Sequence, residues 1–167
     1  MEDFAIESLD NSSIYVRNNA LRVVRNSGNV PLLIRAIENI ENLDHYFNNR
    51  VLVDLVDTFI GDKELLDEAL LDNIDRFSVG FRKIAIQHFT NTLNDKDNTR
   101  VKILNTLSDS KEKELIIAAT KYFGKIIDER ARDYILTNLD SEDWEVRAIS
   151  ARVIAKYNNK DSRAKLL

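Results

Sequence analysis

The stretch FAIESLD at residues 4–10 decides the fold, because it returns at residues 134–140 as YILTNLD. Each copy is followed by a Val-Arg pair, which ends at Arg17 after the first copy and at Arg147 after the second. The two copies and their Val-Arg pairs align at one constant offset, without a gap. Self-similarity at a fixed spacing is the signature of repeat architectures. The chain is therefore predicted to consist of repeated structural units.

The repeat is shorter than the distance between these two copies, because matching residues recur between them. Arg82 stands midway between Arg17 and Arg147, and Arg50 stands midway between Arg17 and Arg82 to within one position. The even spacing of these arginines gives a period of roughly 32 to 33 residues, within the range of known helical repeats. The fourth unit diverges, since Leu115-Ile116 stands where the Val-Arg pair is expected.

Each unit is predicted to form two helices, an arginine helix and a connecting helix. In the first unit, apolar Val16, Ala20, Val23 and Val24 form a helical stripe. The chain has one proline and four glycines, and this scarcity favours an all-α fold. The arginine helices are expected at 13–26, 47–60, 78–92, 112–126 and 142–157. The connecting helices are expected at 30–40, 62–73, 94–107 and 128–139. Three glycines at the ends of arginine helices are expected to be left-handed: Gly28, Gly61 and Gly124.

Length and composition exclude several classes of protein. The 167 residues fit a single domain, 1–167, and 44% of them are apolar, which is enough for a continuous core. The chain has no cysteine, so disulfides, thiolate nucleophiles and zinc–cysteine sites are ruled out. No apolar run approaches the length of a membrane span, and the acidic start lacks the basic region of a signal peptide. A cytoplasmic location is therefore expected.

The two ends of the chain match interrupted units. Residues 4–10 match the end of a connecting helix, and residues 162–167 match the start of the next one. A complete solenoid usually ends in polar caps that shield its core. The sequence is accordingly interpreted as a fragment of a longer solenoid or multidomain protein, which leaves room for a membrane anchor outside these residues. The alternative is a complete small protein with frayed ends.

An aspartate before a turn, followed by Val-Arg at a helix start, resembles the HEAT repeat and its HEAT-like relatives. The resemblance covers nearly the whole chain and implies a right-handed alpha-alpha superhelix, an armadillo-like α-solenoid of about five helix pairs. It also implies a structural ladder of hydrogen bonds between turn aspartates and helix arginines. The ladder residues would be Asp10, Arg17, Arg50, Asp75, Arg82, Asp140 and Arg147. Asp44 with Arg50 would be a shifted version, and Ile116 would break the ladder in the fourth unit.

The sequence contains no catalytic motif, and no catalytic, metal or cofactor-binding residue is predicted. His45 and His88 lie in different units, whereas a metal site needs three or four converging ligands. Trp144 is expected to pack at a helix start. The acidic cluster of the second connecting helix is expected on its solvated face, opposite apolar residues that include Leu65. That cluster consists of Asp62, Glu64, Asp67, Glu68 and Asp72.

Charge is segregated by helix type, since the arginine helices taken together are basic and the connecting helices taken together are acidic. Residues facing away from both core and ladder would form a basic and amide ridge, which Val51, Asp54, Leu55 and Asp57 interrupt in the second unit. The ridge residues are Asn18, Arg22, Arg25, Lys83, Gln87, Lys121, Lys125, Arg152 and Lys156.

Such a ridge suits an acidic protein segment or a phosphate-bearing ligand. The predicted function is a non-catalytic protein-binding scaffold or regulatory module that uses the inner face of the solenoid. The net charge of −4 makes nucleic acid an unfavourable partner. Two alternatives stay open: a HEAT-like enzyme module related to bilin lyases or to DNA glycosylases, and the regulatory domain of a fused enzyme. The sequence predicts no oligomeric state.

Overall fold

A computed structural model describes residues 2–41, 43 and 49–164, and over these residues the protein is all-α. The predicted residues Asp44 and His45 lie outside the described part of the chain. The helices in chain order are α1 (Glu2–Ser8), α2 (Ile14–Asn26), α3 (Val30–Glu41), α4 (Asn49–Asp57), α5 (Lys63–Asn73), α6 (Val79–Asn91), α7 (Asp97–Asp109), α8 (Lys113–Phe123), η1 (Glu129–Ala131), α9 (Arg132–Thr137), η2 (Asn138–Asp140) and α10 (Trp144–Ala164).

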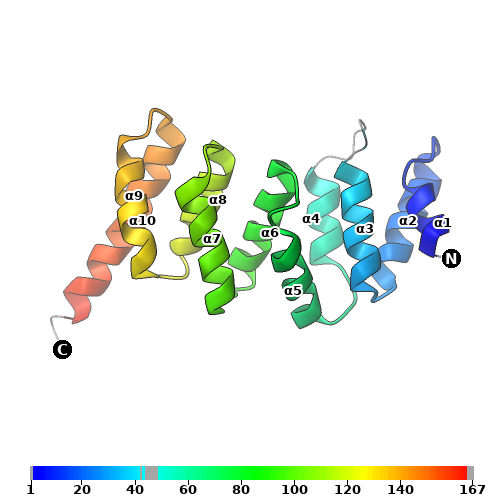
Figure 1. Ribbon diagram of the computed structural model, residues 1–167, viewed down its shortest axis with the longest axis horizontal. Coiled ribbons are helices and arrows are strands. Elements are labelled where there is room, and N and C mark those ends of the chain that lie inside the picture. The colour runs from blue at the N-terminus through cyan, green and yellow to red at the C-terminus, as the bar shows by residue number, and fades with distance from the viewer. Residues whose placement is uncertain (1, 42, 44–48, 165–167) are drawn as a thin grey trace. The chain divides into compact units, whose positions relative to one another are not determined.

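The chain divides into two compact units, Met1–Ala85 (unit 1) and Ile86–Leu167 (unit 2). Helix α6 crosses the division (Figure 1). The prediction of a single domain over 1–167 stays a prediction.

The alternation of two helix types agrees with the sequence pattern. Helices α2, α4, α6, α8 and α10 occupy the positions expected for arginine helices, and α3, α5, α7 and α9 those of connecting helices. Spacing explains why they pack: α3 buries Leu33, Ala36, Ile37 and Ile40, which lie on one face of a helix. Burying a large aliphatic side chain of this kind contributes about 1.5–3 kcal/mol. Neither helix type buries such a face alone, so each unit is stabilised by packing between helices.

Helix α10 is longer than predicted. A new connecting helix was expected to begin at residue 162, but residues 162–164 still belong to α10. The helix runs from Trp144 to Ala164 without a break. The segment after Tyr157 contains neither glycine nor proline, which are the strongest helix breakers. Nothing in the local sequence therefore ends the helix after Tyr157.

The glycines at the helix ends have two different roles, so the prediction for them is only partly right. Gly28 is left-handed, with φ 66°, whereas Gly124 is right-handed, with φ −76°. Gly61 is not left-handed either. A Cβ atom on Gly124 would lie 2.8 Å from Cγ2 of Val153, so glycine here permits close approach of α8 and α10. After α6 the left-handed position is taken by Leu93, with φ 53°.

Replacing Leu93 by glycine is expected to stabilise unit 2 by about 1 kcal/mol, because a left-handed conformation is unfavourable for a residue with a Cβ atom. Leu93 is 56% exposed, so little apolar burial is lost. Urea unfolding followed by fluorescence of Trp144, the only tryptophan, measures the change. The matched variant Gly28→Ala should have the opposite effect in unit 1, followed by circular dichroism, because its Cβ would lie 3.2 Å from the Ile60 carbonyl oxygen. A loss of stability in Leu93→Gly would contradict this account.

The segments that begin at Asn29, Asp62 and Asp128 have a side-chain cap at the repeat spacing, whereas α7 has none at its N-cap residue, Lys96. The carboxylate Oδ1 of Asp62 accepts hydrogen bonds from the backbone N–H groups of Glu64 and Leu65, at 2.9 and 3.1 Å. Asn29, one repeat earlier, caps α3 in the same way through Leu32 N–H at 3.0 Å. Asp128, two repeats after Asp62, caps η1. The cap satisfies N–H groups that a helix start leaves unpaired.

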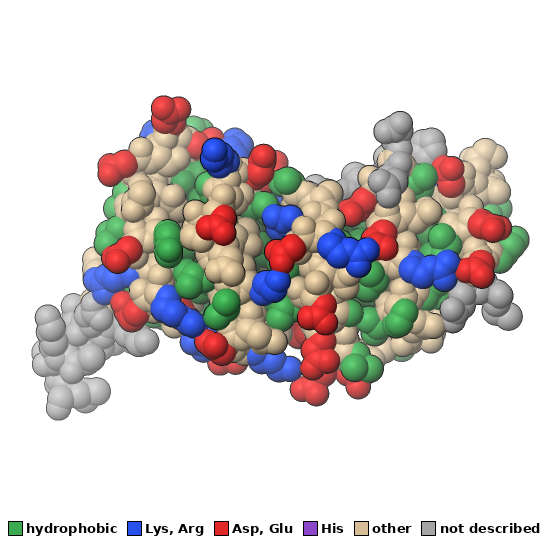
Figure 2. All heavy atoms as spheres, in the orientation of Figure 1, with side chains coloured by type: hydrophobic (Ala, Val, Ile, Leu, Met, Phe, Trp, Pro, Cys, Tyr) green, Lys and Arg blue, Asp and Glu red, His purple; other side chains and the backbone are tan. Residues whose placement is uncertain are grey.

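Ion pairs between adjacent repeats link segments within each unit. Asp3 Oδ1 lies 2.7 Å from Arg35 Nη2 in unit 1, and Asp97 Oδ1 lies 2.8 Å from Arg130 Nη2 in unit 2. A third pair, between Glu38 and Arg76, has a separation of 2.8 Å. Figure 2 shows acidic and basic side chains intermingled on the face that it presents. These pairs are largely exposed, so they add specificity to the stacking more than stability.

Candidate binding surface on the arginine helices

The repeat arginines hold the turn that precedes their own helix. Arg17 Nη1 donates to the carbonyl oxygens of Asn11 and Ser12 in unit 1. Arg147 Nη1 donates to the aligned carbonyls of unit 2, those of Ser141 and Glu142, at 2.7 and 2.8 Å. The same geometry at the same repeat position supports a structural role for these arginines.

Arg82 also donates to the segment before its helix, but to earlier carbonyls of that segment: Nε lies 3.0 Å from the Ile74 carbonyl oxygen and Nη2 lies 3.1 Å from that of Asp75. These arginine contacts run to backbone carbonyls, whereas the resemblance implied carboxylate partners. Asp10, Asp75 and Asp140 are all exposed. An aspartate–arginine ladder through the stack stays a prediction.

Unit 1 has a hollow between two successive arginine helices, α2 and α4. It consists of two adjoining cavities of about 250 and 690 Å³. Cations and carboxylates face each other across it. The charged lining residues are Arg22, Arg25, Arg50, Asp54 and Asp57, and the others include Asn18, Leu21, Val51 and Leu55. This hollow is therefore of mixed charge.

Unit 2 has a corresponding hollow between α8 and α10, with a volume of about 160 Å³. Its apolar wall consists of Ile117, Trp144, Ala148 and Ile149. Its charged lining residues are Lys121, Glu145 and Arg152.

The two hollows use the same positions of the repeat. On α2, Arg22 follows the repeat arginine Arg17 by little more than one helical turn. On α10, Arg152 stands at the same distance from Arg147, and on α8, Lys121 stands at the same distance from Ile116, which replaces the arginine. These three residues of the predicted ridge therefore line hollows between successive arginine helices, while a continuous ridge stays a prediction.

Other predicted ridge residues lie elsewhere. Lys83 and Gln87 are on α6, on either side of the division between units, and line neither hollow. Lys125 is exposed beyond the end of α8. Lys156 Nζ donates to the Gly124 carbonyl oxygen at 2.8 Å, where a cation caps the C-terminus of α8. Lys156 therefore has a structural role that its position in the repeat did not reveal.

Trp144 begins α10, as the expected helix start requires, but the expectation that it is a packing residue is wrong. Its side chain is 66% exposed, on the first turn of α10, where it forms part of the wall of the unit 2 hollow. The aligned residue of unit 1, Ile14, is 51% exposed. This position is therefore exposed in both copies. The prediction failed because both aligned residues are apolar, and apolar residues are usually buried.

The residues considered for chemistry have ordinary surroundings. His88 is buried, with its ring 5.8 Å from that of Phe89 in an edge-on arrangement. In the acidic cluster of α5, Asp67 is half-buried and its other members are exposed, as predicted for a solvated face. Leu65 is 55% exposed, so its assignment to the buried face is wrong. The buried residues of α5 are Leu66, Leu70 and Leu71.

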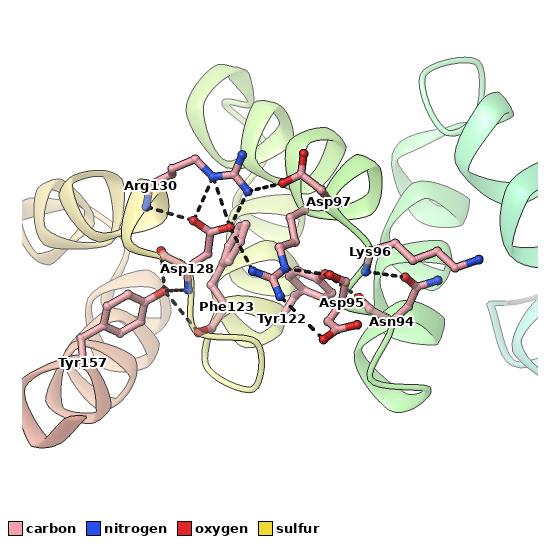
Figure 3. Close-up of polar contacts among 10 residues, drawn as sticks. Asn94, Asp95, Lys96, Asp97, Tyr122, Phe123, Asp128, Arg130 and Tyr157 are labelled. Atoms are coloured by element: carbon pink, nitrogen blue, oxygen red, sulfur yellow. Dashed lines mark hydrogen bonds and ion pairs between the residues drawn. The ribbon is translucent and has the colours of Figure 1, made fainter. Parts of the chain in front are cut away.

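One carboxylate that the sequence did not single out is buried. Figure 3 shows Asp128 between Arg130 and Tyr157. Asp128 Oδ2 lies 2.6 Å from Arg130 Nη2, and its backbone N–H donates to Tyr157 Oη at 3.4 Å. Arg100 Nη1 lies 3.8 Å from the same carboxylate. The sequence pattern carried no signal for this cluster, because an aspartate at the start of a helix is a common cap and its partners Arg100 and Tyr157 come from distant parts of the chain.

The electrostatics of this cluster favour a structural role. The hydrogen bonds from Arg130 hold the pKa of Asp128 below its ordinary value of 3.8, so the carboxylate is ionised at neutral pH. Burial raises the pKa of Tyr122 and Tyr157 to about 12, so both hydroxyls are neutral. A general acid needs a raised pKa near neutrality, and Asp128 has the opposite shift. Its ion pairs and its helix cap therefore account for its position.

Neither the known protein-family models nor the curated proteins include a match to this chain. In the part of the chain that the structure describes, no cluster of acidic and histidine side chains could hold a metal ion. None of the helices described is long and apolar enough to cross a bilayer.

Proposed function

We propose that this chain is a non-catalytic, HEAT-like α-solenoid module that binds an acidic segment of another protein between its successive arginine helices. The observation that carries the proposal is the recurrence of the hollow. The same position of the repeat lines a hollow in unit 1 and another in unit 2, where it carries Arg22, Lys121 and Arg152. Each hollow thus offers at least one cation to an acidic side chain of a partner. A superhelix with a continuous inner face, and a cytoplasmic setting, belong to the same proposal.

The absence of bonding partners for these three cations among the described residues supports the proposal. The side chains of Arg22, Lys121 and Arg152 are exposed and make no hydrogen bond or ion pair with any described residue. Arg17 and Arg147, by contrast, use their guanidinium groups to hold backbone carbonyls. The repeat thus separates structural arginines from cations that are available to a partner. An enzymatic function has no comparable support, since the buried carboxylate of unit 2, Asp128, is an ionised structural group.

Simultaneous reversal of charge at Arg22, Lys121 and Arg152 is expected to reduce affinity for an acidic probe at least tenfold, because each substitution replaces attraction by repulsion. A fluorescein-labelled decamer of glutamate is a suitable probe, and fluorescence anisotropy at low salt measures its binding. Affinity of the unmodified chain should fall as salt rises, because exposed charges are screened.

A control with the same change in net charge keeps this test specific. Lys63, Lys111 and Lys125 are exposed and line neither hollow, so their triple reversal should reduce affinity much less. Equal losses in both triple variants would show that only net charge matters and would remove the hollows as the site. Circular dichroism of each variant checks that the helices are retained.

A further inference from the structure

The unit 2 hollow has two features that the unit 1 hollow lacks, and together they indicate which kind of acidic segment fits there. First, its wall includes an exposed tryptophan, Trp144. Second, the one carboxylate in its lining is already paired with another lysine, so it does not neutralise Lys121 and Arg152. The only acidic lining residue, Glu145, has its Oε1 3.9 Å from Lys113 Nζ. In unit 1, Asp54 and Asp57 line the same hollow as the cations.

The hollow is smaller than a typical small-molecule site and suits one side chain. Small-molecule sites have volumes of about 300–1,000 Å³, whereas this hollow has about 160 Å³. Its walls come from two helices: Ile117 from α8, and Trp144, Ala148 and Ile149 from α10. An apolar side chain placed here would cover part of the indole ring, which is now 66% exposed.

The cations stand on both helices that form the hollow. Lys121 is on α8 and Arg152 is on α10, and both side chains are exposed without a partner among the described residues. A carboxylate on either side of the inserted side chain would have a cation within reach. Burial of an aromatic anchor surrounded by complementary charge is the usual composition of a binding hot spot.

We propose that the hollow between α8 and α10 is the anchoring site for a short peptide segment in which one large apolar residue is flanked by acidic residues. This inference rests on the proposed function and adds the chemical class of the segment. The apolar side chain packs against Trp144, and its acidic neighbours pair with Lys121 and Arg152. The unit 1 hollow, with its mixed charge, contributes less to binding of this segment.

The probe is the synthetic peptide Glu-Asp-Glu-Phe-Glu-Asp-Glu, with a second peptide that has alanine in place of phenylalanine. Trp144 is the only tryptophan, so its own fluorescence reports occupancy of the hollow. The phenylalanine peptide should shift the emission of Trp144 to shorter wavelength and bind at least five times more tightly than the alanine peptide. Trp144→Ala, measured by anisotropy of the labelled peptide, should weaken binding at least tenfold, and so should the pair Lys121→Glu and Arg152→Glu.

The control for Trp144→Ala is Tyr15→Ala, because Tyr15 is an exposed aromatic residue on the first turn of another arginine helix, α2. It should leave the affinity unchanged. Equal affinity for both peptides with no effect of Trp144→Ala would overturn this inference. A remaining effect of the triple charge reversal at Arg22, Lys121 and Arg152 on the glutamate decamer would leave the proposed function standing. If a single-stranded oligonucleotide bound through Trp144 and the peptide did not, the inference would also be overturned. Loss of all charge-dependent binding would instead reject the proposed function itself.

Discussion

Replacement of Tyr157 by alanine is expected to lower the free energy of unfolding of unit 2 by about 4 kcal/mol, as is typical when a large buried aromatic side chain is truncated. The ring is 0% exposed, so its removal leaves a cavity between α10 and its neighbours. The hydroxyl is also placed to bond the backbone: Oη lies 3.3 Å from the carbonyl oxygen of Phe123 and 3.2 Å from that of Asp128. The measurement is urea unfolding followed by Trp144 fluorescence.

Tyr157→Phe separates the two parts of this effect, because it removes the hydroxyl and retains the ring. Losing the hydrogen bonds of a buried polar group costs about 1–3 kcal/mol, so Phe should be less damaging than Ala. Tyr134→Ala is the matched control, since Tyr134 is 43% exposed on the adjacent α9. Equal effects of Tyr157→Ala and Tyr134→Ala would contradict the assignment of Tyr157 to the core.

The repeat pattern predicted the order of the helices and the boundaries of some of them, because packing of helix pairs requires buried residues at regular positions. The expected arginine helix at 78–92 is α6, Val79–Asn91, and the expected connecting helix at 30–40 is α3, Val30–Glu41. The buried residues of each helix must recur at helical spacing, and this spacing can be read from the sequence. The repeat register placed Lys121 and Arg152 beside one hollow.

The features that could not be predicted from the sequence depend on contacts of individual side chains, and the repeat pattern does not specify these contacts. Trp144 occupies a position whose aligned residue is apolar, and apolar residues are commonly buried, but both project outwards here. Lys156 has the phase of a ridge residue and yet bonds a carbonyl at the end of α8. Asp128 was hidden because a helix-capping aspartate is common, and only the fold brings Arg100 and Tyr157 to it. These features required the packing of non-adjacent helices.

The Asp128 carboxylate gives the second large expected effect, since Asp128→Ala should destabilise unit 2 by about 2 kcal/mol, the sum of two losses. Loss of the helix cap accounts for about 1 kcal/mol, and loss of charge-assisted hydrogen bonds to Arg130 accounts for the remainder. Asp128→Asn should cost less, because an amide oxygen can still accept the Arg130 backbone N–H, which lies 3.1 Å from Oδ1. Urea unfolding followed by Trp144 fluorescence measures both variants.

The pH dependence of stability tests whether the negative charge of Asp128 is what stabilises unit 2. The hydrogen bonds from Arg130 keep the pKa of Asp128 in the folded chain below the ordinary value of 3.8, so the unfolded state binds a proton first as the pH falls. The stabilisation by Asp128 is therefore complete well above pH 3.8 and is lost as the pH falls through the folded pKa. The difference in stability between the unmodified chain and Asp128→Asn should accordingly shrink below about pH 4. Asp133→Asn, at an exposed position on α9, is the control for the substitution itself. A difference that stays constant down to about pH 2 would mean that packing, and not the ionised carboxylate, makes Asp128 important.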